Sequence, residues 1–260
     1  MADVRWRLLA LIVVVTATKT WPKNQNRLIN QNRPINQNQP IDQNQLIDQK
    51  RLAEIVEQVI KRLHLERRDS ERNLSMFSLA VNVPGLNGVY HVNAIPDPGD
   101  KIRKDLLRYG VYQDKYVLAA TVLKAKCRNR NQNVKVEHAE YRVLRRFKAW
   151  AAKKPKNQTG LMLFYVFASP CPDRCASNDN NMGRSILPLL KDITEWPQHA
   201  LVFSKVFKPK MGRPINEGEL IKALKNLGSK LGGLENIFRC ERVNQHMKCD
   251  SCSRGGGDHT

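Results

Sequence analysis

Two short motifs, one with a histidine and one with two cysteines, constrain this chain more than any other feature. The first is His138-Ala139-Glu140, and 29 residues separate it from the second, Pro170-Cys171-Pro172-Asp173-Arg174-Cys175. One imidazole and two thiolates supply three ligands of a tetrahedral zinc ion and leave the fourth position open for water. A carboxylate two residues after the histidine can move the protons of that water. We therefore expect a Zn²⁺ site with His138, Cys171 and Cys175 as ligands and Glu140 as the catalytic acid–base.

The spacing within each motif places these side chains at the starts of helices. Residues i and i+2 of a helix point about 200° apart, so His138 and Glu140 can meet one metal only beyond the N-terminal end of the helix. Cys171 and Cys175 can reach the same metal from the first turn of a second helix. The prolines of the second motif suit the strand-to-helix corner before that turn. Two helix N-termini directed at one ion would favour the thiolate forms.

Each motif alone has a simpler explanation. An isolated His-x-Glu is common on solvated surfaces. Two cysteines this close in an exported chain often form disulfides. The order of the two motifs, and the position of each beside an expected strand–helix junction, favour the metal site.

The apolar pattern predicts an α/β domain, residues 51–245. The apolar residues that start at Leu52 recur at helical spacing to about Leu65, and after residue 115 strands alternate with helices, which indicates a layered α/β fold. The expected strands are Met76–Val83, Val89–Ile95, Tyr116–Lys126, Leu161–Ala168, Ala200–Phe207 and Ile237–Val243. The other expected helices are Val136–Lys153 and Glu217–Leu231. Residues 246–260, which end in a glycine-rich stretch, are expected to form a flexible tail.

The N-terminal residues 1–17 have the features of a secretory signal peptide. Arg5 and Arg7 precede the apolar run Leu8–Val15, and Val15-Thr16-Ala17 is a plausible cleavage site. The run is too short to span a bilayer, which needs about 20 apolar residues. We expect a secreted, extracellular protein without a transmembrane segment.

Residues 18–50 are of low complexity. Hexads that approximate Asn-Gln-Asn-(Arg/Gln)-(Leu/Pro)-Ile repeat from Asn24, and a fifth, divergent hexad is Asp48–Ala53. One apolar pair every six residues matches neither the helical nor the strand period, and Pro34 and Pro40 add breaks. A disordered spacer is the expectation, with a multivalent tether as the alternative.

The residues around the two motifs resemble a known family. Val136-Glu137-His138-Ala139-Glu140 and Phe167-Ala168-Ser169-Pro170-Cys171 are similar to the AID/APOBEC-like branch of the cytidine deaminase superfamily. With the export signal, the chain resembles the secreted novel AID/APOBEC-like deaminases over about residues 70–245. The chain departs from that pattern in its three-residue gap between the cysteines and at Ala168, where nucleic-acid-editing relatives often have a tryptophan.

The resemblance implies both a fold and an activity. The implied fold is a cytidine deaminase-like mixed β-sheet flanked by helices on both faces, preceded by the disordered repeat segment. The implied activity is zinc-dependent, hydrolytic C-to-U deamination of single-stranded DNA or RNA outside the cell, with a role in immunity. Two alternatives remain: a non-catalytic, cationic nucleic-acid-binding protein on a deaminase scaffold, and a deaminase of free cytidine or deoxycytidine.

The net charge of +20 favours polyanionic partners, among them single-stranded nucleic acid. Phe207 or Trp150 could stack on bases, although Trp150 equally fits the core. The basic run also fits an ordinary solvated surface. The candidate phosphate contacts are Arg142, Arg145, Arg146, Lys205, Lys208, Lys210 and Arg213.

Four further cysteines are disulfide candidates in an exported chain: Cys127, Cys240, Cys249 and Cys252. Three pairings are possible, and the expected one joins Cys127 to Cys240 and pairs the last two cysteines locally. A second zinc site that combines His246 with the last three cysteines is the alternative. Asn73 and Asn157 begin N-glycosylation sequons, which could equally be unused. The sequence does not indicate an oligomeric state.

Overall fold

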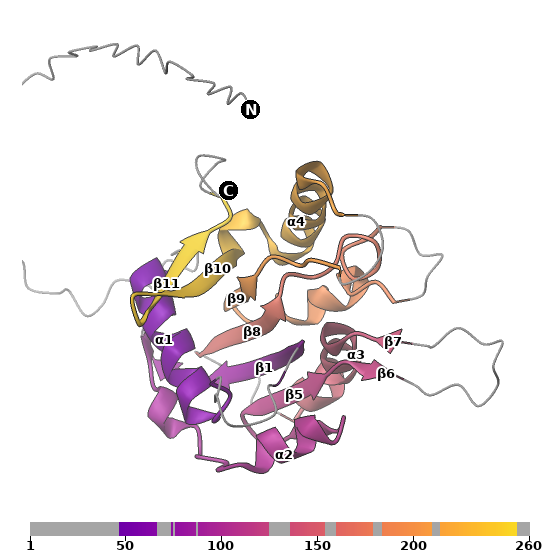
Figure 1. Ribbon diagram of the computed structural model, residues 1–260. Helices are drawn as coiled ribbons and strands as arrows, with labels where there is room; N and C mark the ends of the chain where they lie inside the picture. Colours follow the sequence, from indigo (N-terminus) through magenta and orange to yellow (C-terminus); the bar gives the residue numbers. More distant parts are fainter. Residues whose placement is uncertain are drawn as a thin grey trace, which may run out of the picture. The chain divides into compact units, whose positions relative to one another are not determined.

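The strand that feeds the second motif, β8 (Leu161–Ala168), lies in the middle of a seven-stranded sheet. Seven of its eight residues are buried, as expected for a strand covered on both sides. The order of the sheet is β11-β10-β9-β8-β1-β5-β4. β8, β9 and β10 run parallel to one another, and the other neighbouring pairs are antiparallel. The sheet is therefore mixed, as predicted, and Figure 1 shows β11 at one end of it.

The computed structural model describes residues 47–66, 74, 76–86, 88–124, 136–153, 160–178, 184–209 and 214–253. The expected signal peptide and most of the repeat segment lie outside these residues. The other strands of the large sheet are β1 (Phe77–Val83), β4 (Val111–Gln113), β5 (Val117–Thr121), β9 (Gln198–Lys205), β10 (Ile237–Val243) and β11 (His246–Ser251). Two short hairpins pair β2 (Gly85–Leu86) with β3 (Val89–Tyr90) and β6 (Leu123–Lys124) with β7 (Val136–Glu137).

Helices cover both faces of the sheet, which confirms the predicted layers (Figure 1). α1 (Gln49–Arg62) and α2 (Lys101–Leu107) bury apolar side chains in the core on one face. α3 (Ala139–Ala151) and α4 (Glu217–Leu231) bury theirs in the core on the other face. Short 3₁₀ helices are η1 (Val92–Ala94), η3 (Leu187–Asp192) and η4 (Leu234–Asn236).

The first helix begins inside the repeat segment. Asp48 is its N-cap, and the Asp48 carboxylate accepts a hydrogen bond from the backbone N–H of Arg51 at 2.8 Å. The fifth hexad therefore forms the cap and first turn of α1. Its apolar side chains, Leu52 and Ala53, are buried against the sheet, so the expected disordered segment ends before residue 48.

The expected flexible tail is wrong for residues 246–253. β11 pairs with β10 over six residues, through a turn at Asn244 and Gln245, which both have positive φ. Such a turn matches the twist of antiparallel strands and brings a polar segment into the sheet by backbone pairing. The expected strand Val89–Ile95 is also wrong in extent, since it divides into β3 and η1. α2 and β4 were not predicted, because their short apolar patterns give little periodicity.

Candidate metal centre

His138 lies where the backbone changes from strand to helix. β7 ends at Glu137, α3 begins at Ala139, and His138 is the N-cap residue with extended backbone angles. This position directs its imidazole out of the helix end, toward the second motif. Nδ1 of His138 lies 3.1 Å from Sγ of Cys175 and 3.5 Å from Sγ of Cys171. The structure thus brings together the three residues that the sequence predicted as ligands.

The two cysteines lie on a turn rather than on the first turn of a helix, which corrects the prediction. Residues 172–176 form turns directly after β8. The turn is closed by a hydrogen bond from the N–H of Ala176 to the carbonyl of Cys171, at 3.0 Å. The N–H of Cys175 also points at Sγ of Cys171, at 3.4 Å.

Hydrogen bonds from two distant segments hold this turn and the strand before His138, and no motif in the sequence predicts them. Asn226 of α4 donates a hydrogen bond to the carbonyl of Ala176 at 2.9 Å. The N–H of Ile186 donates to the carbonyl of Cys175 at 2.9 Å. Arg184 donates to the carbonyl of Val136, two residues before His138. These contacts fix the backbone on both sides of the cluster.

The cluster has the donor set and the spacing of a zinc site. The ligand atoms of His138, Cys171 and Cys175 lie within 4.8 Å of one another. Two ligands on a tetrahedral ion with usual Zn–N and Zn–S bond lengths are about 3.5 Å apart, which matches the two nitrogen–sulfur distances above. Both cysteines are buried and His138 is half-buried. These three residues could therefore hold a metal ion.

Hydrogen bonds within the cluster favour the thiolate form of Cys171. Hydrogen bonding with Cys175, and with His138, lowers the pKa of Cys171 to about 4 against the opposing effect of burial. The hydrogen bond with Cys171 raises the pKa of His138. The thiolate is the form that binds a metal. The hydrogen bond with Cys171, together with burial, raises the pKa of Cys175, so a metal ion would have to displace protons from Cys175 and His138 on binding.

Glu140 lies inside the protein, in the first turn of α3. Its side chain is 4% exposed, and burial raises its pKa to about 7. The carboxylate interacts electrostatically with His138 and with Cys171, which places it beside the cluster. Among the described residues, no Lys or Arg side chain forms an ion pair with it. A buried carboxyl group without an ion-pair partner costs stability, and such groups concentrate at functional sites.

One family model matches the chain over residues 96–259, which is more than half of its length. The family is described as Secreted Novel AID/APOBEC-like Deaminase 1. The chain belongs to this family. The match contains all four residues of the predicted site. A search of the curated proteins finds no match.

Membership of the Secreted Novel AID/APOBEC-like Deaminase 1 family agrees with the predicted scaffold and, through its name, with secretion. Among the described helices, none is long and apolar enough to cross a membrane. The expected signal peptide and the two predicted sequon residues, Asn73 and Asn157, lie outside the described residues.

Arg142 is not a surface contact for nucleic acid, contrary to the prediction. It is 4% exposed, and its guanidinium donates to the carbonyls of Thr121 at 2.5 Å and Tyr109 at 2.7 Å. The prediction was wrong because Arg142 lies, with its neighbour Val143, on the buried side of α3. Trp150 is also a core residue, at 1% exposure, and it donates a hydrogen bond to the carbonyl of Asp114.

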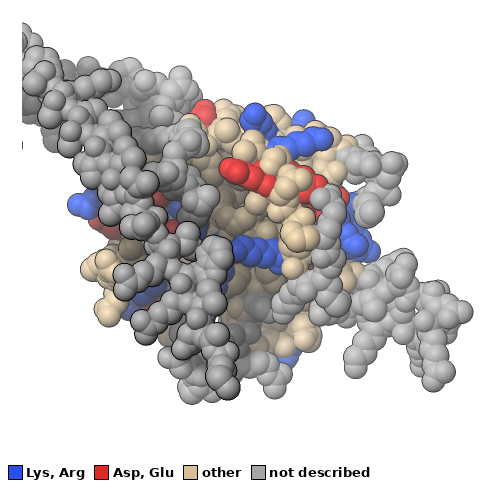
Figure 2. Space-filling model, turned by 45° about the horizontal axis from the view of Figure 1, so that its top comes forward, with Lys and Arg blue, Asp and Glu red and all other residues tan. Residues whose placement is uncertain are grey.

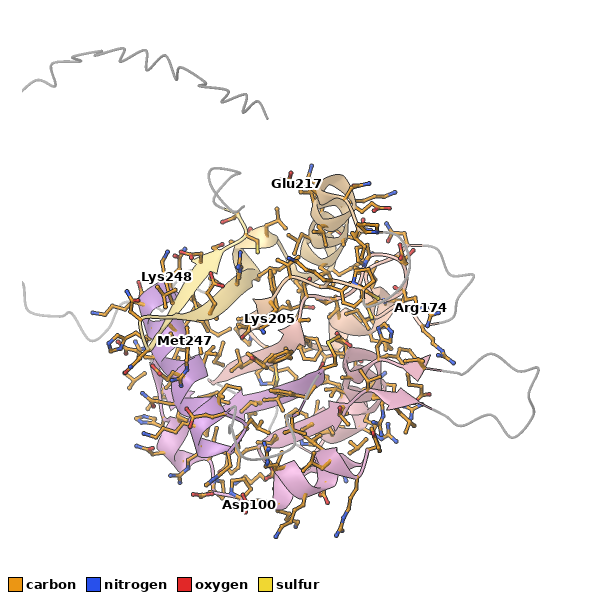
Figure 3. The ribbon with its side chains drawn as sticks, in the orientation of Figure 1. Asp100, Arg174, Lys205, Glu217, Met247 and Lys248 are labelled. Atoms are coloured by element: carbon orange, nitrogen blue, oxygen red, sulfur yellow. A yellow bond between two sulfur atoms is a disulfide. The ribbon has the colours of Figure 1, made fainter. Side chains whose placement is uncertain are left out.

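The remaining basic candidates differ in their surroundings. Arg145 is exposed in part and forms an ion pair with Glu137 at 3.1 Å, while burial lowers the pKa of Arg146. Lys205 lies at the carboxyl end of β9 (Figure 3), with its ammonium group over the ring of Phe167. Lys208 is exposed. Lys210 and Arg213 lie outside the described residues. On the face that Figure 2 shows, the visible Lys and Arg side chains lie at separate places among other residues.

A serine directly before the second motif connects the cysteine turn to the end of β9. The hydroxyl of Ser169 accepts a hydrogen bond from the N–H of Phe207 at 2.9 Å, and the N–H of Ser169 donates to the carbonyl of Lys205 at 2.7 Å. Ser169 is buried. Residues 205–208, which include the half-buried Phe207, are therefore held next to the cysteine turn.

The disulfide of the domain joins Cys240 to Cys249, so the expected pairing of Cys127 with Cys240 is wrong. These residues face each other directly in the β10–β11 register. The expected local pair of Cys249 with Cys252 is also wrong, since Cys252 is a half-buried thiol whose pKa is raised to about 11 by burial. The alternative second zinc site is excluded with it, because two of its ligands are consumed. Cys127 lies outside the described residues.

Proposed function

We propose that this protein is a zinc-dependent cytosine deaminase that acts on single-stranded DNA or RNA outside the cell. The observation that carries the proposal is the buried Glu140 carboxyl group beside a cluster of one imidazole and two thiols. Family membership supports a deaminase scaffold. The chemistry of this donor set supports zinc, since nitrogen and sulfur ligands with one open position characterise catalytic zinc sites.

His138, Cys171 and Cys175 would hold the ion. When bound, zinc supplies a Lewis acid that lowers the pKa of a water molecule at the site. Cys171 contributes a thiolate that its own hydrogen bonds stabilise. Asn226 and Arg184 hydrogen-bond to backbone carbonyl groups next to the ligands. These bonds would hold the ligands in place before the ion binds, so that little conformational entropy is lost on binding.

Glu140 would move the protons of the reaction. Its carboxylate accepts one proton from the attacking water and delivers it to the cytosine ring nitrogen N3; it then accepts the second proton, from the new hydroxyl group on C4, and delivers that one to the leaving amine. Oxygen adds to C4 of cytosine and ammonia departs, which converts cytosine to uracil. Burial suits this role, because a carboxyl group with a pKa near neutrality can both accept and release a proton.

The exposed basic residues would bind the strand that carries the base. Lys205 and Lys208 lie within a segment that hydrogen bonds of Ser169 join to the cysteine turn, which supports them as contacts to phosphates beside the reacting cytosine. Arg145 is a further candidate on α3. Arg142 takes no part in this surface.

The decisive experiment is incubation of the mature protein, loaded with zinc, with single-stranded DNA and RNA of mixed sequence. Sequencing of the products should show cytosine-to-uracil change that Glu140→Gln reduces by about 10²–10⁴-fold. The variant should retain zinc and fold, which metal analysis and circular dichroism check. Strand binding without turnover by the zinc-loaded wild type would instead support the cationic binding protein, and turnover of free cytidine alone would support the nucleoside enzyme.

A further inference from the structure

The last strand of the sheet presents an open edge. β11 is the outermost strand, and only β10 pairs with it among the described strands (Figure 1). The N–H of Cys252 donates to the carbonyl of Ile237. In an antiparallel pair, alternate residues point their backbone groups toward and away from the partner strand. His246, Lys248 and Asp250 therefore pair with β10, and Met247, Cys249 and Ser251 direct their N–H and C=O groups outward.

No described residue forms a backbone hydrogen bond with this outward row. The edge is also stiff, because the disulfide from Cys249 to Cys240 fixes β11 to its neighbour. The other edge of the sheet is different. β4 has only three residues and carries α2 beside it, whereas β11 offers six. Open edges of this length are templates for a further strand.

There is room for such a strand on the α1 side of the edge. A groove of about 810 Å³ is lined by the first turns of α1 and by β11. Met247 turns toward this side, packed against the core, while Lys248 is on the exposed face (Figure 3). Side chains of an added strand that face α1 would enter the groove.

The charges on β11 select the partner. Lys248 and Asp250 are exposed, at 65% and 37%, and their charged groups are 3.2 Å apart. A second β11, antiparallel to the first about a twofold axis at Cys249, places Lys248 of each copy opposite Asp250 of the other. In the same register Met247 lies opposite Ser251, so all outward residues meet in hydrogen-bonded pairs. A shift to the neighbouring permitted registers puts Lys248 opposite Lys248 or Asp250 opposite Asp250, which like-charge repulsion disfavours.

We propose that β11 is a self-association surface, through which two copies of this protein join their sheets edge to edge. The strand is complementary to itself, as a twofold interface requires. Each copy contributes one basic and one acidic side chain, so the centre of the interface is neutral although the chain carries a net charge of +20. This association is independent of the proposed deaminase activity.

Charge reversal tests the proposal with the full chain. Sedimentation velocity across a concentration range should show a monomer–dimer equilibrium for the wild type at physiological salt. Lys248→Glu alone and Asp250→Lys alone should each weaken dimerisation by about tenfold or more, because two attractive cross-strand pairs become repulsive. The double variant Lys248→Glu/Asp250→Lys should restore it. An equimolar mixture of the two single variants should form a heterodimer, since each repulsive pair is then replaced by an attractive one.

A second measurement covers the backbone. Hydrogen exchange of the Met247, Cys249 and Ser251 amides should slow as the protein concentration rises, with no such change in Lys248→Glu, whose circular dichroism should match the wild type. A wild type that stays monomeric up to its solubility limit would overturn the proposal. So would a dimer that the single variants do not weaken, or a double variant that dimerises no better than they do.

Discussion

The two faces of the sheet differ in the kinds of side chain that they bury. The α1 face is closed by apolar contacts and by the disulfide between Cys240 and Cys249. The α3 face buries Glu140, Arg142 and the two thiols of the second motif among its apolar side chains. Polar groups cost free energy when they are buried without full compensation. The difference indicates that the α1 face mainly stabilises the domain. The α3 face holds a site whose buried polar groups are not explained by a contribution to stability.

We expect the largest change from removing a metal ligand on the α3 face. Cys175→Ser should lower the bound zinc from about one ion per chain to almost none, because the site loses one of three ligands and a soft donor. Metal analysis of the purified variant measures this. The zinc-loaded wild type should also lose thermal stability on treatment with a chelator, while the variant should not respond. Full zinc occupancy in Cys175→Ser would exclude Cys175 as a ligand.

A core substitution on the α1 face should act on stability alone. Leu52 is fully buried in α1, and Leu52→Ala should lower the free energy of unfolding by about 2–5 kcal/mol through lost burial and a cavity. Denaturant unfolding measures the change. The zinc content of the folded variant should equal that of the wild type. Ile221→Ala on α4, where Ile221 is 43% exposed, is the control and should change stability by less than about 0.5 kcal/mol.

Loss of the disulfide should have a smaller effect on the same face. The double variant Cys240→Ala/Cys249→Ala opens a link across nine residues of sequence separation, and we expect a loss of about 2–3 kcal/mol. Urea unfolding with and without reductant should distinguish the wild type from the variant, which reductant leaves unchanged. A simultaneous loss of zinc would contradict the view that the two faces act separately.

The smallest expected effect concerns strand binding, and it rests on the proposed function. Lys205→Ala and Lys208→Ala should each weaken binding to single-stranded DNA a few-fold and reduce its salt dependence by about one counterion. Fluorescence anisotropy at several salt concentrations measures both quantities. Lys61→Ala removes an exposed cation of α1 and is the matched control. Equal losses in all three variants would show that net charge, rather than a site at residues 205–208, binds the strand.

Much of the fold followed from local patterns. The strand Leu161–Ala168 and the helix Glu217–Leu231 have the bounds that their apolar residues predicted. β11 escaped prediction because its polar residues have no period of their own, and pairing with β10 orders them. The burial of Arg142 escaped for a related reason: its partners are carbonyl groups at Thr121 and Tyr109, which are remote in sequence.

For this protein, the sequence alone determined the residue types of the site and the layered α/β class, because ligand chemistry and apolar periodicity are local properties. Only the tertiary structure decided that Cys240 pairs with Cys249, that the cysteine motif forms a turn, and that α3 turns Arg142 inward. Those outcomes depend on which segments the sheet order brings together. Contacts between segments distant in sequence have no signature in either segment by itself.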